Sequence, residues 1–442
     1  MEMFTLSATQ AADLIRQRKI SSVELVEALL HRISGLDPAL RAWETVDRER
    51  ALEQARRADR EAPSGPLHGV PLGIKDIYYT AGLRTTSGSP IFRDFVPSHD
   101  STAVARLRQA GAIILGKTVT VQFAHHDPPT TRNPWNHSRT PGGSSSGSAA
   151  AVAARMVPAA MGSQTGGSIL RPASYCGVVG LKPTYGRVSR YGVTPASWSL
   201  DHMGPITRSV EDAALLLQVV AGPDPMDPAS SHHPVGDYLG AARRKDRAPR
   251  LGLVPDFLEW AQPEVAAHMR DAAVQLEAAG ADVREIRLPM AMPDILAVRS
   301  IIAEVEQASV HARLLKNNPQ GYAPLVRGTV EVGQLIPAAA YIQAQRLRRM
   351  LRPMMEEMLR EVDCLVMPTV SNVAPPLDTT GDASFQAVWS LFGFPSITLP
   401  SGLTPGRLPF GTQLAALPFQ EEVLLSAAAW AEAVFSPMPS PV

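Results

Sequence analysis

The sequence predicts an α/β fold in which helices cover a largely parallel or mixed sheet. Two observations carry this prediction. Short apolar runs, bounded by Gly and Pro turn signals, alternate along the chain with longer amphipathic stretches, which is the pattern of strands alternating with helices. Apolar residues make up 45% of the 442 residues and charged residues 19%, so the chain can bury a substantial core.

The first 62 residues are expected to form an N-terminal helical segment. Residues 7–18 and 21–33 show the apolar spacing of amphipathic helices, and residues 47–60 suggest a third, highly charged helix. Ser21 stands three residues before Glu24, which is the pattern of a capping box. The second helix is therefore expected to begin at this serine.

The rest of the chain alternates between strands and helices. The sequence predicts strands at residues 70–77, 112–115, 178–181, 251–254, 282–286 and 363–367. It predicts helices at residues 101–110, 148–155, 210–220, 294–315, 338–359 and 420–433. Residues 222–250 are rich in Pro and charge and suggest a surface excursion or a joint between subdomains. Length alone favours two or three domains.

Composition and charge exclude several classes of protein. Lys plus Arg equals Asp plus Glu at 42 each, so no global field attracts nucleic acid or an anionic membrane, and we expect neither as a partner. Cys176 and Cys364 are far apart and lack the spacing of a zinc site or a disulfide framework. The first residues carry no export signal. We therefore expect a cytoplasmic protein without a metal site.

Two Gly/Ser clusters and a lysine mark the region where chemistry is expected. The clusters are residues 141–148 and 162–168, and Lys75 lies upstream in an apolar strand. Glycine allows main-chain N–H groups to approach a ligand closely, as an oxyanion hole requires. A serine needs a neighbouring base to act as a nucleophile, and lysine can supply one. The pattern suggests a serine nucleophile activated by Lys75.

Two other motif matches are interpreted as accidental. Residues 111–118 fit the phosphate-loop pattern, but a helix precedes them and their interior is an apolar strand, whereas a phosphate loop needs the reverse order. Residues 143–147 fit the nucleophile elbow of esterases, but polar loop stands where that elbow needs a strand.

The residues in and around the two clusters resemble the amidase-signature family. The resemblance rests on Gly-Ile-Lys-Asp at 73–76, the Gly/Ser clusters at 140–149 and 162–168, and the segment 176–186. It extends over essentially the whole chain. It implies one compact domain, residues 1–442, in which helices cover both faces of a large mixed sheet, and so overrides the expectation from length.

The resemblance assigns a Ser-Ser-Lys catalytic triad. It implies that Ser168 is the nucleophile, Ser144 the bridging serine and Lys75 the base, and that the Gly143–Ser144 peptide bond is cis. Burial among apolar neighbours would lower the pKa of the lysine enough for it to accept a proton near neutral pH.

The resemblance also places the oxyanion hole and the walls of the substrate pocket. The main-chain N–H groups of Thr165, Gly166, Gly167 and Ser168 would hold the oxyanion. The pocket would be lined by residues 125–132, 295–341 and 378–389.

One departure from the family pattern points to the substrate. Most members carry Asp where this chain has Gln164, and Arg where it has Leu170; here the arginine follows one residue later, at Arg171. This arrangement is similar to the malonamidase-like branch, in which the arginine meets a substrate carboxylate. We expect Arg171 and Gln164 to bind substrate. The alternative for Arg171 is a structural ion pair within the loop.

These residues together predict an amidohydrolase. It would cleave the C–N bond of a small amide that bears a carboxylate or ureide group, through an acyl-serine intermediate and without a cofactor. The expected partners are the small-molecule amide and either a second copy of the chain or a small accessory subunit.

Two alternatives stay open. The first is the glutaminase subunit of a tRNA-dependent amidotransferase, which works with partner subunits and usually carries the Asp and early Arg that this chain lacks. The second is a catalytically inactive binding or scaffold protein, against which the three intact catalytic positions argue.

Overall fold

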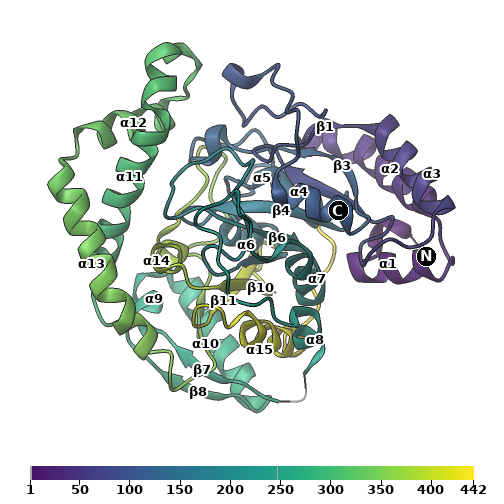
Figure 1. The fold of residues 1–442 in the computed structure, drawn as a ribbon. Coiled ribbons are helices and arrows are strands. Elements are labelled where there is room, and N and C mark those ends of the chain that lie inside the picture. Colours follow the sequence, from purple (N-terminus) through teal and green to yellow (C-terminus); the bar gives the residue numbers. More distant parts are fainter. Residues whose placement is uncertain (1, 246) are drawn as a thin grey trace.

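One eleven-stranded sheet runs through the computed structural model, which describes residues 2–245 and 247–442 (Figure 1). The strands lie side by side in the order β1-β3-β2-β4-β6-β5-β10-β11-β9-β7-β8. Their bounds are β1 (Trp43–Val46), β2 (Pro71–Lys75), β3 (Ile113–Thr118), β4 (Ala159–Gln164), β5 (Val179–Lys182), β6 (His202–Thr207), β7 (Arg250–Leu253), β8 (Asp282–Glu285), β9 (Cys364–Pro368), β10 (Ser396–Leu403) and β11 (Pro409–Ala415).

The sheet is mixed, as predicted. Strand β2 is parallel to β3 and β4, and β7 is parallel to β8 and β9, whereas the remaining neighbours are antiparallel. The sequence does not predict strand β4, because Ala-Ala-Met-Gly-Ser-Gln has low strand propensity. Its place between β2 and β6 supplies the backbone hydrogen bonds that its side chains do not favour.

The α-helices lie on both sides of this sheet, and the confirmed fold is a single α/β domain (Figure 1). Their bounds are α1 (Ala8–Arg16), α2 (Ser22–Leu40), α3 (Arg48–Arg60), α4 (Thr102–Gln109), α5 (Ser146–Ala153), α6 (Leu170–Cys176), α7 (Val210–Val220), α8 (Tyr238–Arg243), α9 (Pro255–Trp260), α10 (Pro263–Ala278), α11 (Met292–Asn317), α12 (Pro324–Leu335), α13 (Ala338–Glu357), α14 (Ser384–Phe392) and α15 (Glu421–Val434). The capping box at Ser21 is confirmed, with the Glu24 carboxylate accepting the Ser21 N–H at 2.7 Å.

The N-terminal segment and residues 222–250 join the domain in different ways. The N-terminal 62 residues contain α1 to α3, but also β1, which extends the main sheet beside β3. Residues 222–250 contain the short helix α8, which packs against α7 and α15. Both segments are therefore tied to the same core.

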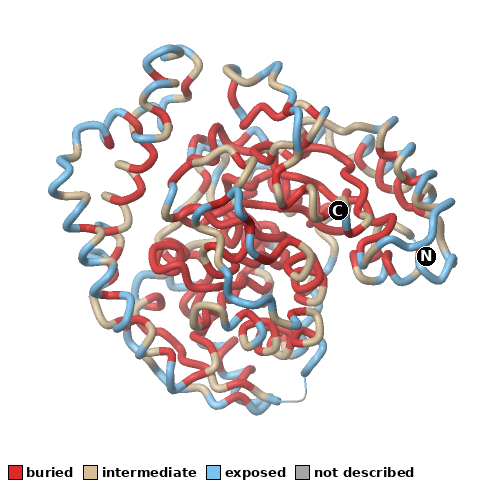
Figure 2. Tube along the Cα trace, viewed as in Figure 1, coloured by how far each residue is buried: buried red, intermediate tan, exposed pale blue. Residues whose placement is uncertain are grey.

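Burial separates the centre of the molecule from one side. Buried residues fill the sheet and the helices that contact it, whereas much of α12 and α13 is exposed (Figure 2). These two helices pack along α11 on one flank of the molecule, away from α1 to α3 (Figure 1). Within residues 2–245 and 247–442 no helix is both long enough and apolar enough to cross a bilayer.

Candidate active site

Lys75 ends strand β2 in the interior of the protein. Its side chain is inaccessible to solvent, and its Nζ lies 2.7 Å from Ser144 Oγ and 2.8 Å from Ser163 Oγ. Burial lowers the lysine pKa well below its usual value; the Asp201 carboxylate opposes this effect, and the Arg171 guanidinium adds to it. The amine is therefore poised to be neutral, as a general base must be.

Ser144 lies in the loop before α5, where the Gly143–Ser144 peptide bond is cis, as the resemblance implied. The Ser144 carbonyl accepts a hydrogen bond from the Val121 N–H at 3.2 Å. One residue later, the Ser145 N–H donates to the Ser168 carbonyl at 3.3 Å. These bonds bring the loop that holds Ser144 against the loop that holds Ser168.

Residues 165–168 form the tight loop between β4 and α6. The N–H groups of Thr165, Gly166, Gly167 and Ser168 have no hydrogen-bond acceptor in the described part of the chain. Thr165 is fixed by its hydroxyl, which donates to Asp201 at 2.6 Å. Four unpaired donors on one turn suit a site that stabilises an oxyanion.

Gln164 holds this loop from behind. Its Oε1 accepts the N–H groups of Ile169 and Leu170 at 2.9 and 3.0 Å, and its Nε2 donates to Ser390 Oγ at 3.1 Å. Gln164 is fully buried and does not line the cavity that contains Ser168. Its surroundings favour a role in shaping the loop over the substrate contact expected from the sequence.

Arg171 reaches from α6 to two other loops. Its Nε and Nη2 donate to the Gly143 carbonyl at 3.2 and 2.7 Å, and its Nη1 donates to the Gly381 carbonyl. Burial lowers the arginine pKa to about 10. No carboxylate of the described residues forms an ion pair with Arg171, so the alternative of a structural ion pair is not what the contacts show.

A cavity of about 390 Å³ opens beside the nucleophile. The oxyanion loop forms one wall, and the three segments expected from the resemblance form the others, which confirms that prediction. The lining residues are Ala124, His125, His126, Thr165, Gly166, Gly167, Ser168, Arg171, Arg299, Ala303, Glu304, Gln307, Leu325, Thr329, Thr379, Thr380, Gly381, Asp382 and Ala383. Arg299 is the member of this set that no sequence motif indicates.

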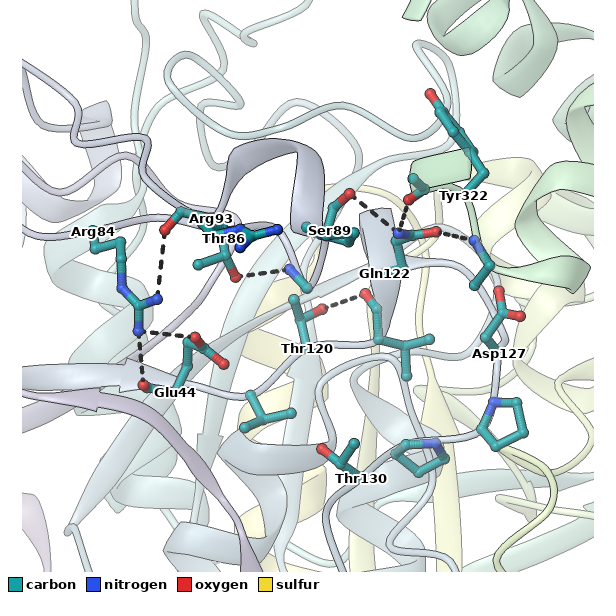
Figure 3. Close-up of a pocket in the computed structure, with 18 of the residues that line it drawn as sticks. Glu44, Arg84, Thr86, Ser89, Arg93, Thr120, Gln122, Asp127, Thr130 and Tyr322 are labelled. Carbon is teal, nitrogen blue, oxygen red and sulfur yellow. Dashed lines mark hydrogen bonds and ion pairs between the residues drawn. The ribbon is translucent and has the colours of Figure 1, made fainter. Parts of the chain in front are cut away.

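A second, larger cavity of about 620 Å³ contains none of the predicted catalytic residues (Figure 3). Gln122 stands at its centre, donating to Ser89 Oγ and the Gly321 carbonyl and accepting the Ala323 N–H. The Asp127 side chain accepts the N–H groups of Leu325 and Val326 at the start of α12. These polar groups are spent on holding α12 to the body of the domain.

Ser163 and Arg299 are the residues that sequence reasoning missed. Ser163 lies next to Gln164 in a strand of small residues, and its hydroxyl is one of many in this region. Arg299 lies in α11, over a hundred positions from the catalytic loops. The phosphate-loop match is explained by the structure: residues 113–118 are strand β3, and Lys117 is buried.

The amidase family matches residues 24–425. This chain belongs to the amidase family. One curated relative belongs to the glutamyl-tRNA(Gln) amidotransferase of Geobacter sp. (strain M21), of which it is one subunit. It is 40% identical to this amidase over 97% of each chain.

Solved structures agree. A chain described in a study of an unexpected vestigial protein complex and the origins of an s-triazine catabolic enzyme superimposes with a TM-score of 0.92, at 31% identity, over 97% of this amidase and 98% of that chain. The corresponding glutamyl-tRNA(Gln) amidotransferase chain of Thermotoga maritima gives a TM-score of 0.85 at 30% identity, over 100% and 98%. The amidase is thus an enzyme that acts on amide C–N bonds, not an inactive scaffold.

The relatives correct the expected partners. The balanced charge predicts no contact with nucleic acid and a small molecule as the substrate, yet relatives at 40% identity are subunits of an enzyme named for glutamyl-tRNA(Gln), so that expectation is wrong. Net charge averages over the surface and over one subunit only. Here a run of exposed arginines on α13, Arg346, Arg349 and Arg352, is hidden in a total of zero.

Proposed function

We propose that Ser168, Ser144 and Lys75 carry out acyl transfer. Neutral Lys75 takes the proton of Ser144 as Ser144 takes that of Ser168, and Ser168 Oγ bonds to the amide carbon. The carbonyl electron pair moves to oxygen, where the N–H groups of residues 165–168 stabilise it. When the C–N bond breaks, the amine leaves with the proton returned from Lys75. Water then releases the acid by the same route.

We propose further that this amidase is the ammonia-releasing subunit of an amidotransferase that acts on a charged tRNA, with glutamine as the amide. The observation that carries this proposal is the 40% identity to the Geobacter amidotransferase chain over 97% of both chains. That relative is by name one part of a larger enzyme, so other subunits would complete the activity.

The likeness to the malonamidase-like branch bears on the acyl group and not on the partners. We infer that the substrate carries a carboxylate, because Arg171 lies in the wall of the cavity beside Ser168. Glutamine and malonamate both meet this condition. The buried, unbonded thiols of Cys176 and Cys364 support a cytoplasmic location.

The test is ammonia release from glutamine, measured for the chain alone and with the other subunits of an amidotransferase and glutamyl-tRNA(Gln). We expect turnover that rises when the partners are present and is lost in Ser168→Ala. Malonamate, biuret-type ureides and aryl amides serve as comparison substrates. Turnover of any of these together with no turnover of glutamine, even with partners, would contradict the amidotransferase proposal while leaving the amidase itself intact.

A further inference from the structure

Arg299 places a second guanidinium in the active-site cavity. It projects from α11 to the oxyanion loop, where a Cβ added to Gly166 would lie only 2.8 Å from its Nη2. Glycine at this position therefore lets the guanidinium approach the main chain two residues before the nucleophile. A positive charge at this distance faces whatever group the acyl chain of the substrate presents next to its amide.

The guanidinium of Arg299 has no partner in the described chain. Its Nε is shielded from solvent and makes no hydrogen bond, and no ion pair or hydrogen bond of its Nη atoms joins it to residues 2–245 or 247–442. Glu304 lines the same cavity, but it is not within ion-pair distance of Arg299. Leaving a buried charged donor unpaired costs free energy, so a group that supplies an acceptor would bind here favourably.

Arg171 differs from Arg299 in this respect. Three of its N–H groups are used by the carbonyls of Gly143 and Gly381, and these bonds join the Ser144 loop to the far wall of the cavity. A substrate that took these donors would break the bonds that place Ser144. The free guanidinium in the cavity is that of Arg299.

His125 supplies an independent sign of a missing ligand. Its side chain is 5% exposed, lines the cavity, and makes no hydrogen bond through either ring nitrogen. Burial lowers its pKa well below the usual value, with further lowering from His311, His126 and Arg299, so the ring is neutral. A neutral imidazole has one N–H donor to offer. An oxyanion in the cavity would satisfy this donor as well as the guanidinium.

We infer that Arg299 and His125 form the subsite that binds the carboxylate of the amide substrate, and that Arg171 is a positioning residue for Ser144. This inference rests on the proposed function, since it names the acyl group that the same site would hold. Gly166 belongs to the oxyanion loop and touches the Arg299 position. A short acyl chain, as in malonamate or glutamine, is therefore expected to link the carboxylate to the amide carbon.

The inference can be tested by binding in the Ser168→Ala background, where turnover is absent. Titration calorimetry would compare malonamate and glutamine with malonamide, the neutral counterpart of malonamate. We expect Arg299→Gln to raise the Kd of the two carboxylate probes by about 10- to 100-fold, the range of a charge-assisted hydrogen bond, and to change that of malonamide by less than about threefold. His125→Phe should weaken the same two probes by a smaller factor.

Two further variants control for folding and for charge. Arg299→Lys keeps the positive charge and should recover part of the affinity for malonamate. Arg313→Gln removes an exposed arginine from the same helix and should leave every Kd unchanged. Circular dichroism and thermal unfolding would confirm that each variant is folded.

The outcomes separate the two proposals. Equal affinity of Ser168→Ala for malonamate with and without Arg299→Gln, or equal loss for malonamate and malonamide, would overturn the subsite. Carboxylate binding that depends on Arg299, in a chain that never releases ammonia from glutamine, would support the subsite and overturn the amidotransferase role instead.

Discussion

Lys75 and Lys117 are two buried lysines on adjacent parallel strands, and only one of them is suited to be a base. Ile74 on β2 pairs in register with Lys117 on β3, so the two side chains leave neighbouring positions of one sheet. Both are fully buried. What differs is the set of groups around each amine, and that difference decides the protonation state.

Lys117 is kept charged by a carboxylate. Its Nζ lies 3.2 Å from Asp76 Oδ1 and donates to the Tyr78 carbonyl and Thr85 Oγ1. Burial lowers its pKa, but Asp76 raises it again, to about 8. Lys75 contacts hydroxyls only, and its pKa falls further. Burial alone is therefore not what makes a lysine a base; the absence of a contacting carboxylate is equally needed.

The largest effect is expected when the base is removed. Lys75→Met should lower kcat by about 10²- to 10⁴-fold, because general-base catalysis contributes in that range, while the protein stays folded. Ammonia release would measure the rate and urea unfolding the stability. Activity within tenfold of the wild type would show that Lys75 is not the base.

The counterpart at the other lysine should affect stability instead. Lys117→Met leaves Asp76 buried without its cation, and we expect the free energy of unfolding to fall by about 3 to 5 kcal/mol. Combining Lys117→Met with Asp76→Asn should restore part of this loss, as urea unfolding would show. A single variant as stable as the wild type would mean that the pair contributes nothing.

The two lysines should also differ in how they respond to pH. The rate should rise about tenfold per pH unit below the Lys75 pKa, because only the neutral amine accepts a proton. Each lysine binds fewer protons folded than unfolded between its lowered pKa and about 10.4, so stability rises with pH in that window and is lost as pH falls through it.

For Lys117 the window opens only above about pH 8, whereas for Lys75 it begins lower. Unfolding of Lys75→Met and Lys117→Met across pH would reveal the window that each variant lacks. Identical pH profiles for the two variants would contradict the difference between the two sites.

The smallest effect is expected at Ser163, which touches Lys75 from outside the proposed triad. Ser163→Ala removes one hydrogen bond to the amine and should cost about 0.5 to 1.5 kcal/mol, seen as a loss of up to roughly tenfold in kcat. Ser144→Ala, measured in the same assay, should cost much more, since it breaks the proton relay. Equal losses would mean that Ser163 also relays protons.

The local parts of the fold could be predicted from the sequence. The helices around residues 210–220 and 338–359 and the strand that carries Lys75 lie where apolar periodicity places them. Strand β4 and helix α14 could not be predicted, because their sequences mix small and aromatic residues without a clear period and take their form from the elements packed around them. The boundaries of the confirmed elements shift by one to several residues, as unpaired ends usually do.

The sequence by itself determined the chemistry, because the residues that define it are close together in the chain or in a recognisable motif. Two glycine-rich loops with serines at 144 and 168 and a lysine in an apolar strand were enough to propose an amidase, and the family comparison agrees. Only the tertiary structure decided which arginine faces the substrate. Arg171 stands in the motif, but its donors are taken by carbonyls from loops near residues 143 and 381. Arg299 comes from a distant helix, and its position over Gly166 depends on long-range packing that no local pattern encodes.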